Sequence, residues 1–255
     1  MKTKCSLGLG LISFVMVGMA HAHVAYNTTG YDSTGQGGLD GAQPANWIGG
    51  SGPTDYTGSM DAMWFMEFHS DSSTLTASTA DALSKGAAAD YALAVGPKGW
   101  RFNSSAPNTG RYHGMDFGLI HLEEAAQLTI TLTALASGLI PGMSFYSGWD
   151  SGSAWDRLAV NYTNNAGSPV GTTGLTYLGN AAGTAGGSSI TYTAGTLAAG
   201  DYTLFIGGVV GTSVTAGKYS ASFAVTPVPE PETVWMLGIG VLAVAARVRR
   251  SRLAC

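Results

Sequence analysis

The seven residues Gln127-Leu128-Thr129-Ile130-Thr131-Leu132-Thr133 decide the fold class of this chain. Apolar and polar residues alternate strictly, so Leu128, Ile130 and Leu132 share one face of an extended chain and the threonines share the other. An amphipathic helix would instead repeat its apolar residues every three or four positions. The stretch therefore predicts a half-buried β-strand.

The same period of two recurs toward the C-terminus, where Lys218 to Val225 places Tyr219, Phe223 and Val225 on one face. Other apolar runs predict further strands, at 62–68, 91–95, 143–149, 157–162 and 201–206. A short helix is expected at 81–89, with Ser78 or Thr79 as its cap. Residues 164–200, rich in Gly, Ala, Ser and Thr, are expected to be the least regular internal region.

Short strands separated by Gly, Asn and Ser predict an all-β fold, an antiparallel β-sandwich of the jelly-roll or Ig-like type. No proline-rich linker divides residues 23–226, so we expect one β-sandwich body there. The stretch 116–226 also resembles the β-sandwich modules that follow many secreted bacterial enzymes, through its strands at 200–206 and 217–220.

The composition and charge argue against nucleic-acid binding. Only 11% of the 255 residues are charged, whereas 45% are hydrophobic and 37 are glycine. Residues 23–229 hold six basic and 14 acidic residues, a net charge of −8. So acidic a body lacks the basic surface that nucleic-acid binding requires. We expect no nucleic-acid partner.

The first 22 residues have the features of a secretory signal peptide. Lys2 and Lys4 precede an apolar run from Leu7 to Ala20, and the small residues Ala20 and Ala22 fit the cleavage pocket of signal peptidase. Cleavage after Ala22 would leave His23 as the new N-terminus. The alternative is an uncleaved anchor, which the short apolar run disfavours.

Residues 227–255 form a second predicted targeting signal. Pro229-Glu230-Pro231 precedes an apolar run from Trp235 to Ala246, which is shorter than the roughly 20 residues of a permanent membrane span. A basic cluster follows and is expected to stay on the cytoplasmic side; it consists of Arg247, Arg249, Arg250 and Arg252. The alternative is an ordinary membrane anchor behind a proline-rich linker.

This tripartite ending resembles the PEP-CTERM sorting signal of Gram-negative bacteria that make extracellular polysaccharide. The resemblance implies a transient inner-membrane helix, cleavage by an exosortase near Pro229-Glu230-Pro231, and delivery to the outer surface or extracellular matrix. Both cysteines lie in predicted targeting signals, Cys5 in the N-terminal one and Cys255 in the C-terminal one. The mature body would then have no disulfide and no Cys-based metal site.

Histidines suggest one kind of metal site. If cleavage follows Ala22, His23 offers an α-amino group and an imidazole, and a second histidine would complete the brace that holds copper in some secreted oxidases and copper carriers. His69 and His113 are the candidate partners. The alternative is a solvated N-terminus and histidines that serve only structure.

The loop with Trp149, Asp150, Trp155 and Asp156 suggests a second kind of site. An indole stacks on sugar rings, and aspartate oxygens bind Ca²⁺. The loop is therefore a candidate glycan or calcium site, although it has no Asp-x-Asp-x-Asp-Gly calcium motif. The alternative is a turn in which the tryptophans cover the core edge and the aspartates cap turns.

Signatures of catalysis are missing from the sequence. It has no G-x-S-x-G, P-loop or H-E-x-x-H motif. Glu67 and Asp116 are carboxylates that would have to meet in space for glycoside hydrolysis. We expect a non-catalytic surface or matrix protein that associates with exopolysaccharide in a biofilm and has no required cofactor. The alternatives are a copper-binding protein or oxidase that uses His23, and a carbohydrate-binding or glycan-active module.

Overall fold

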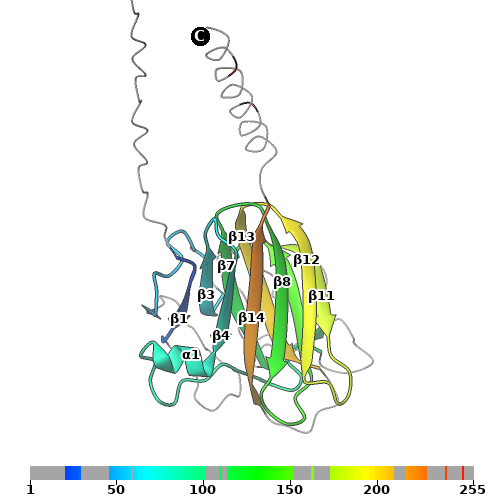
Figure 1. Ribbon diagram of the computed structural model, residues 1–255. Helices are drawn as coiled ribbons and strands as arrows, with labels where there is room; N and C mark the ends of the chain where they lie inside the picture. The colour runs from blue at the N-terminus through cyan, green and yellow to red at the C-terminus, as the bar shows by residue number, and fades with distance from the viewer. Residues whose placement is uncertain are drawn as a thin grey trace, which may run out of the picture.

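The computed structural model is mostly β, with two sheets stacked as a sandwich (Figure 1). It describes residues 21–29, 46–58, 60–101, 109–110, 114–151, 162–163, 173–209, 216–228, 239 and 249. The sheet of β4, β14, β8 and β12 faces the viewer in Figure 1, and the larger sheet lies behind it.

The larger sheet has seven strands and carries the candidate site. Their order is β11 (Thr176–Ala182), β9 (Pro141–Ser147), β13 (Gly200–Gly208), β7 (Met115–Leu122), β3 (Ala62–Phe68), β1 (His23–Asn27) and β2 (Trp47–Ile48). All neighbouring pairs are antiparallel except β3 and β7, which run parallel.

The smaller sheet has the order β12 (Ser189–Leu197), β8 (Ala126–Ala134), β14 (Gly217–Pro227) and β4 (Ser73–Ser78), and β5 (Ala94–Val95) also pairs with β14. The short strands β6 (Thr109–Gly110) and β10 (Tyr162–Thr163) pair with each other. Helix α1 (Thr79–Ser84) follows β4 directly. The Ser78 hydroxyl caps it by accepting a hydrogen bond from the Asp81 amide at 3.1 Å.

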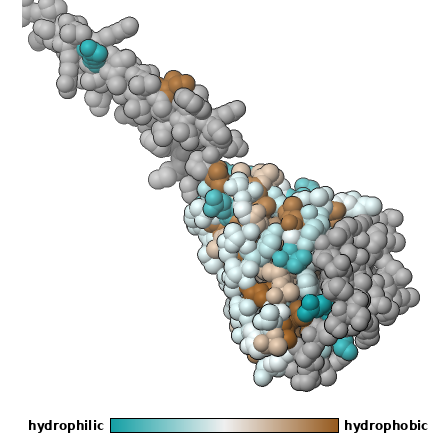
Figure 2. Space-filling model, turned by 90° about the vertical axis from the view of Figure 1, so that its right-hand side faces the viewer, coloured by the Kyte–Doolittle hydropathy of each residue, from teal (hydrophilic) through white to brown (hydrophobic). Residues whose placement is uncertain are grey.

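Alternation along the strands of the smaller sheet places the core between the sheets, as the sequence predicted. Leu128, Ile130 and Leu132 of β8 are fully buried, as are Tyr219 and Phe223 of β14. The other face carries mainly Thr and Ser, which are half-buried or exposed. Figure 2 shows the molecule from the right-hand side of Figure 1, where the described surface is mostly pale with scattered hydrophobic and hydrophilic residues.

The inner face of the larger sheet supplies the other half of the core. Trp64 is fully buried, packs edge-on against Phe223 at 5.2 Å between ring centroids, and donates a hydrogen bond from Nε1 to the Tyr219 hydroxyl at 3.1 Å. This bond joins β3 of one sheet to β14 of the other. It fixes the relative position of the two layers at their centre.

The expectation of a purely antiparallel sandwich was wrong for one pair. After β3 the chain crosses to the other sheet through β4, α1 and β5 before it returns as β7. Such a crossover lets the returning strand run parallel to the first, which a tight hairpin does not allow. The sandwich is therefore of mixed type.

Three further features differ from the predictions. Residues 164–200 contain the two strands β11 and β12, where little regularity was expected. The helix begins at Thr79 and ends at Ser84, earlier than predicted. Of the predicted strand at 91–95, only Ala94 and Val95 pair.

The predicted signal peptide lies almost entirely outside the described residues, as do Pro229-Glu230-Pro231, Arg247, Arg250 and Arg252. Ile239 and Arg249, which are described, are helical and exposed. Among the described residues, no helix has the length and apolar character needed to cross a membrane.

Candidate metal centre

His23 and Glu67 face each other across two paired strands. His23 is the first residue of β1, and the antiparallel register with β3 sets it directly opposite Glu67. His23 Nδ1 lies 3.7 Å from Glu67 Oε2, and both side chains are about a quarter exposed. Directly opposed residues of neighbouring strands have side chains close enough to share a ligand.

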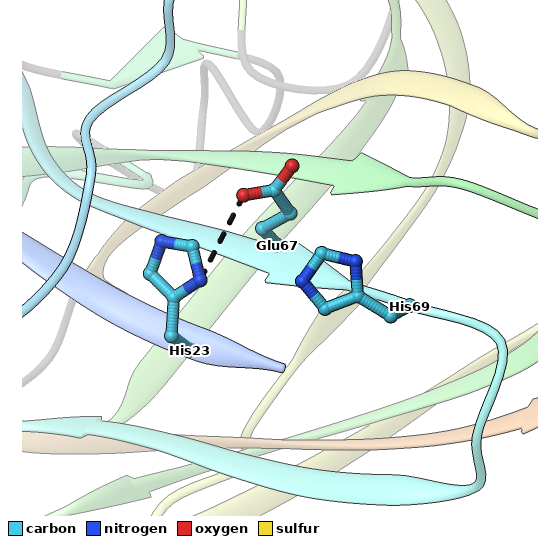
Figure 3. A group of neighbouring side chains, drawn as sticks. All are labelled: His23, Glu67 and His69. Atoms are coloured by element: carbon cyan, nitrogen blue, oxygen red, sulfur yellow. Dashed lines mark ion pairs between the residues drawn. The ribbon is translucent and has the colours of Figure 1, made fainter. Parts of the chain in front are cut away.

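His69 joins this pair because of the strand period. It follows Glu67 by two residues at the end of β3, and residues two apart point to the same face. The three side chains point toward one another in Figure 3. One potential ligand atom from each of His23, Glu67 and His69 lies within 4.8 Å of the others. We call these three residues the triad.

Each imidazole of the triad is held by a further contact. His69 Nδ1 lies 2.7 Å from Glu123 Oε1, and His23 Nε2 lies 3.0 Å from the backbone oxygen of Ser51. A carbonyl oxygen only accepts hydrogen bonds, so in the neutral imidazole His23 Nε2 carries the hydrogen and Nδ1 keeps its lone pair. The Glu123 carboxylate attracts a proton to His69 Nδ1 by its charge, although the contact lacks hydrogen-bond geometry, and Nε2 is then the nitrogen available to an ion.

Packing restricts the two rings as well. The His23 and His69 rings stack with centroids 6.4 Å apart, and the edge of His23 meets Phe65 at 6.2 Å. Gly50 lies so close above His23 that a Cβ atom there would come within 2.2 Å of His23 Cδ2. The orientation of His23 therefore depends on the absence of a side chain at Gly50.

The donor set suits a transition-metal ion. Ligand atoms about 2.0–2.2 Å from one ion lie no more than about 4.4 Å from each other. The His23–Glu67 separation of 3.7 Å meets this limit, and the 4.8 Å bound on the triad leaves only a small contraction. Two imidazole nitrogens and one carboxylate oxygen suit zinc, copper, nickel or iron.

The structure brings together only some of the candidate residues. His69 lies beside His23, whereas His113 is outside the described residues. Glu67 was considered from the sequence as half of a carboxylate pair, but its place beside the two histidines was missed. The spacing Glu67-x-His69 at the end of a predicted strand was a local signal for it.

The carboxylate pair considered for glycoside hydrolysis does not form. Glu67 lies on the outer face of the larger sheet, with the triad. Asp116 is buried on the inner face, where its charge acts on the core residue Tyr219. Alternation along β3 and β7 sets these two carboxylates on opposite faces.

The Trp-Asp loop is only partly described, because Trp155 and Asp156 lie outside the described residues. Asp150 is 2% exposed, and its Oδ2 accepts a hydrogen bond from the Met60 amide at 3.0 Å. Trp149 donates from Nε1 to the Tyr202 carbonyl at 3.1 Å. These contacts fit the structural alternative for Asp150, whereas Trp149 also lines a pocket together with Glu67.

Comparisons with known proteins identify the C-terminal segment. Residues 227–250 match the family model of the PEP-CTERM protein-sorting motif, so the resemblance noted in the sequence is confirmed. The chain is thus an exosortase substrate, and the motif indicates export to the cell surface. The chain matches none of the curated proteins.

Several solved structures are similar at low identity. CorA, a surface-associated copper-binding protein of Methylomicrobium album BG8, is 14% identical over 53% of this chain and 92% of its own, with a TM-score of 0.40. MopE, a secreted protein of Methylococcus capsulatus in which an oxidized tryptophan facilitates copper binding, is 10% identical over 80% and 94%, with a TM-score of 0.37. The pre-peptidase C-terminal domain of a Bacillus anthracis collagenase is 13% identical over 63% and 92%, with a TM-score of 0.25. Likenesses this weak assign no ligand to this chain.

Proposed function

We propose that this exported cell-surface protein binds a copper ion through His23, Glu67 and His69. The observation that carries the proposal is the convergence of one ligand atom from each residue within 4.8 Å. The contacts of Ser51 and Glu123 support it, because each favours the neutral tautomer whose lone pair faces the centre.

Copper is favoured by the chemistry of the donors. Signal-peptide cleavage after Ala22, as predicted, would add the α-amino group of His23 as a third nitrogen ligand. A tetragonal set of nitrogen and oxygen donors is typical of Cu(II) or Ni(II), and sites of this kind bind Cu(II) more tightly than the neighbouring divalent metals. Without that cleavage, the two histidines and the glutamate would form a set common in zinc sites.

The proposed role is binding at the surface rather than turnover, since the triad supplies ligands and specifies no substrate. The acidic body suits a protein that attracts cations. Association with exopolysaccharide stays a prediction from the sequence, because no contact among the described residues bears on it.

The test is a Cu(II) titration of the chain beginning at His23. Calorimetry measures the affinity, and electron paramagnetic resonance identifies the ligand atoms. We expect one tightly bound ion with nitrogen hyperfine structure, and a loss of at least about tenfold in affinity for His69→Ala. His121→Ala is the matched control, because it removes a histidine of the same sheet face that is not in the triad. Equal affinities for His69→Ala and the unchanged chain would overturn the proposal.

A second form of the chain, with one residue added before His23, separates the roles of the ligands. Weaker Cu(II) binding by this form identifies the α-amino group as a ligand. Unchanged binding that still requires His69 identifies the triad as sufficient.

A further inference from the structure

The polar row that begins at the triad continues across the sheet. His23, Glu67, His121 and Asp201 are successive register partners on β1, β3, β7 and β13. His121 Nδ1 lies 2.7 Å from Asp201 Oδ1, so this second pair is as closely joined as His69 and Glu123. Glu67 lies between the two histidines in the row.

A pocket opens beside this row, at Glu67, His121 and Asp201. Its volume is about 160 Å³, and Phe65, Glu67, His121, Trp149 and Asp201 line it together with the loop 51–55. Pockets for drug-sized molecules measure roughly 300–1,000 Å³. The pocket therefore has room for a small molecule or for one small group of a larger molecule.

The aromatic wall of the pocket is fixed in place. Trp149 is held by its hydrogen bond to the Tyr202 carbonyl, and its ring meets the edges of Phe65 and Tyr56, each at 5.9 Å between centroids. A ring that is held before binding loses little conformational entropy when a ligand arrives.

The charge of the wall selects the kind of ligand. Three carboxylates line the pocket, from Asp55, Glu67 and Asp201, against the single imidazole of His121. No lysine or arginine occurs among the described residues that line it. Carboxylates and the faces of aromatic rings both attract cations.

We propose that this pocket binds a small organic cation that carries an ammonium group. The ammonium group would lie among the carboxylates of Asp55, Glu67 and Asp201, and the carbon skeleton would pack on Trp149. The proposal goes beyond copper binding, because it needs no metal ion. An amino sugar of a surface polysaccharide and the ethanolamine headgroup of a lipid both present this chemistry.

Glu67 belongs to the triad and to the pocket. The metal ion and the organic cation should therefore each weaken the binding of the other. A metal ion at the triad neutralises the Glu67 carboxylate and removes part of the attraction for the ammonium group. Because linkage is reciprocal, the cation should weaken metal binding by the same factor.

The experiment uses the purified protein after removal of metal with a chelator. Glucosamine and ethanolamine are titrated by calorimetry and by tryptophan fluorescence, each against a neutral counterpart, glucose and ethylene glycol. We expect an amine to bind and its neutral counterpart not to bind, with Trp149 reporting the event. The amine that binds identifies the source of the ligand.

Variants separate this proposal from the metal site. Asp55→Asn and Asp201→Asn should each weaken amine binding by about tenfold, the loss typical of one charged contact, and leave Cu(II) affinity unchanged. His69→Ala should weaken Cu(II) binding and leave amine binding unchanged. Two results would overturn the proposal: equal binding of the amines and their neutral counterparts, or amine binding that neither Asp variant changes.

Discussion

The imidazole of His69 and the carboxylate of Glu123 lie 2.7 Å apart, from Nδ1 to Oε1, and join the end of β3 to the turn after β7. The His69 side chain is 10% exposed, so this contact is shielded more than most surface pairs. The contact lacks hydrogen-bond geometry, but the carboxylate attracts a proton to Nδ1 and so favours the tautomer whose other nitrogen can bind a metal ion.

Replacement of Glu123 by Gln should therefore weaken Cu(II) binding by about 10- to 100-fold without removing any ligand. Calorimetry measures the change. Glu124→Gln is the matched control, because it removes the same charge one residue away. Equal effects of the two variants would mean that only the net charge matters and that Glu123 does not orient His69.

Gly50 provides a steric test of the same centre. In Gly50→Ala the new Cβ would come within 2.2 Å of His23 Cδ2, so the ring must leave its present position beside Glu67. We expect about tenfold weaker Cu(II) binding, since an orienting contact of a ligand is lost, and an unchanged melting temperature. Ser51→Ala is the control, because His23 contacts the backbone oxygen of that residue and not its side chain.

The buried bond between Trp64 and Tyr219 should contribute to stability and not to metal binding. Tyr219→Phe leaves the Trp64 N–H without its acceptor in the core, at a cost of about 1–3 kcal/mol. Urea unfolding measures this loss of free energy. Tyr202→Phe, which removes a hydroxyl that donates to the Ala198 carbonyl nearer the surface, should cost less.

Alkaline pH should destabilise the fold through its buried phenols. Burial raises the pKa of Tyr26, Tyr146 and Tyr219 above the ordinary value, and hydrogen bonding to Asp81 adds to the effect at Tyr26. The unfolded chain loses these protons above about pH 10 while the folded chain keeps them. Stability is thus fully present below about pH 10 and falls as the pH rises further.

Thermal unfolding between pH 8 and pH 12 measures this loss, and phenolate absorbance follows the tyrosines. The absorbance of these three residues should appear together with unfolding. Their ionisation in a still-folded protein would contradict the burial argument.

Local patterns were sufficient to predict the central strands. Residues 127–133 and 218–225 alternate cleanly because one face is fully buried and the other is polar, and the structure confirms both strands. Strands β11 and β12 were missed, since they lie at the sheet edges and bury few apolar side chains. A pattern of burial cannot predict strands that bury little.

The candidate site was less predictable because it depends on register. The position of His23 after the predicted cleavage site pointed to a metal ligand, and His69 was one of two suggested partners. Glu67 comes opposite His23 only through the pairing of β1 with β3, which lie about 40 residues apart in the sequence. No local pattern encodes such a pairing.

One turn, after β7, contacts both the triad and the start of the C-terminal sorting segment. Glu123 holds His69, and two residues later the Ala125 carbonyl accepts a hydrogen bond from the Val228 amide at 2.8 Å, next to the PEP-CTERM motif. The proposed metal centre and the start of the sorting segment therefore share one pole of the sandwich. A protein fastened by this pole would turn its triad toward the cell and its opposite pole toward the medium.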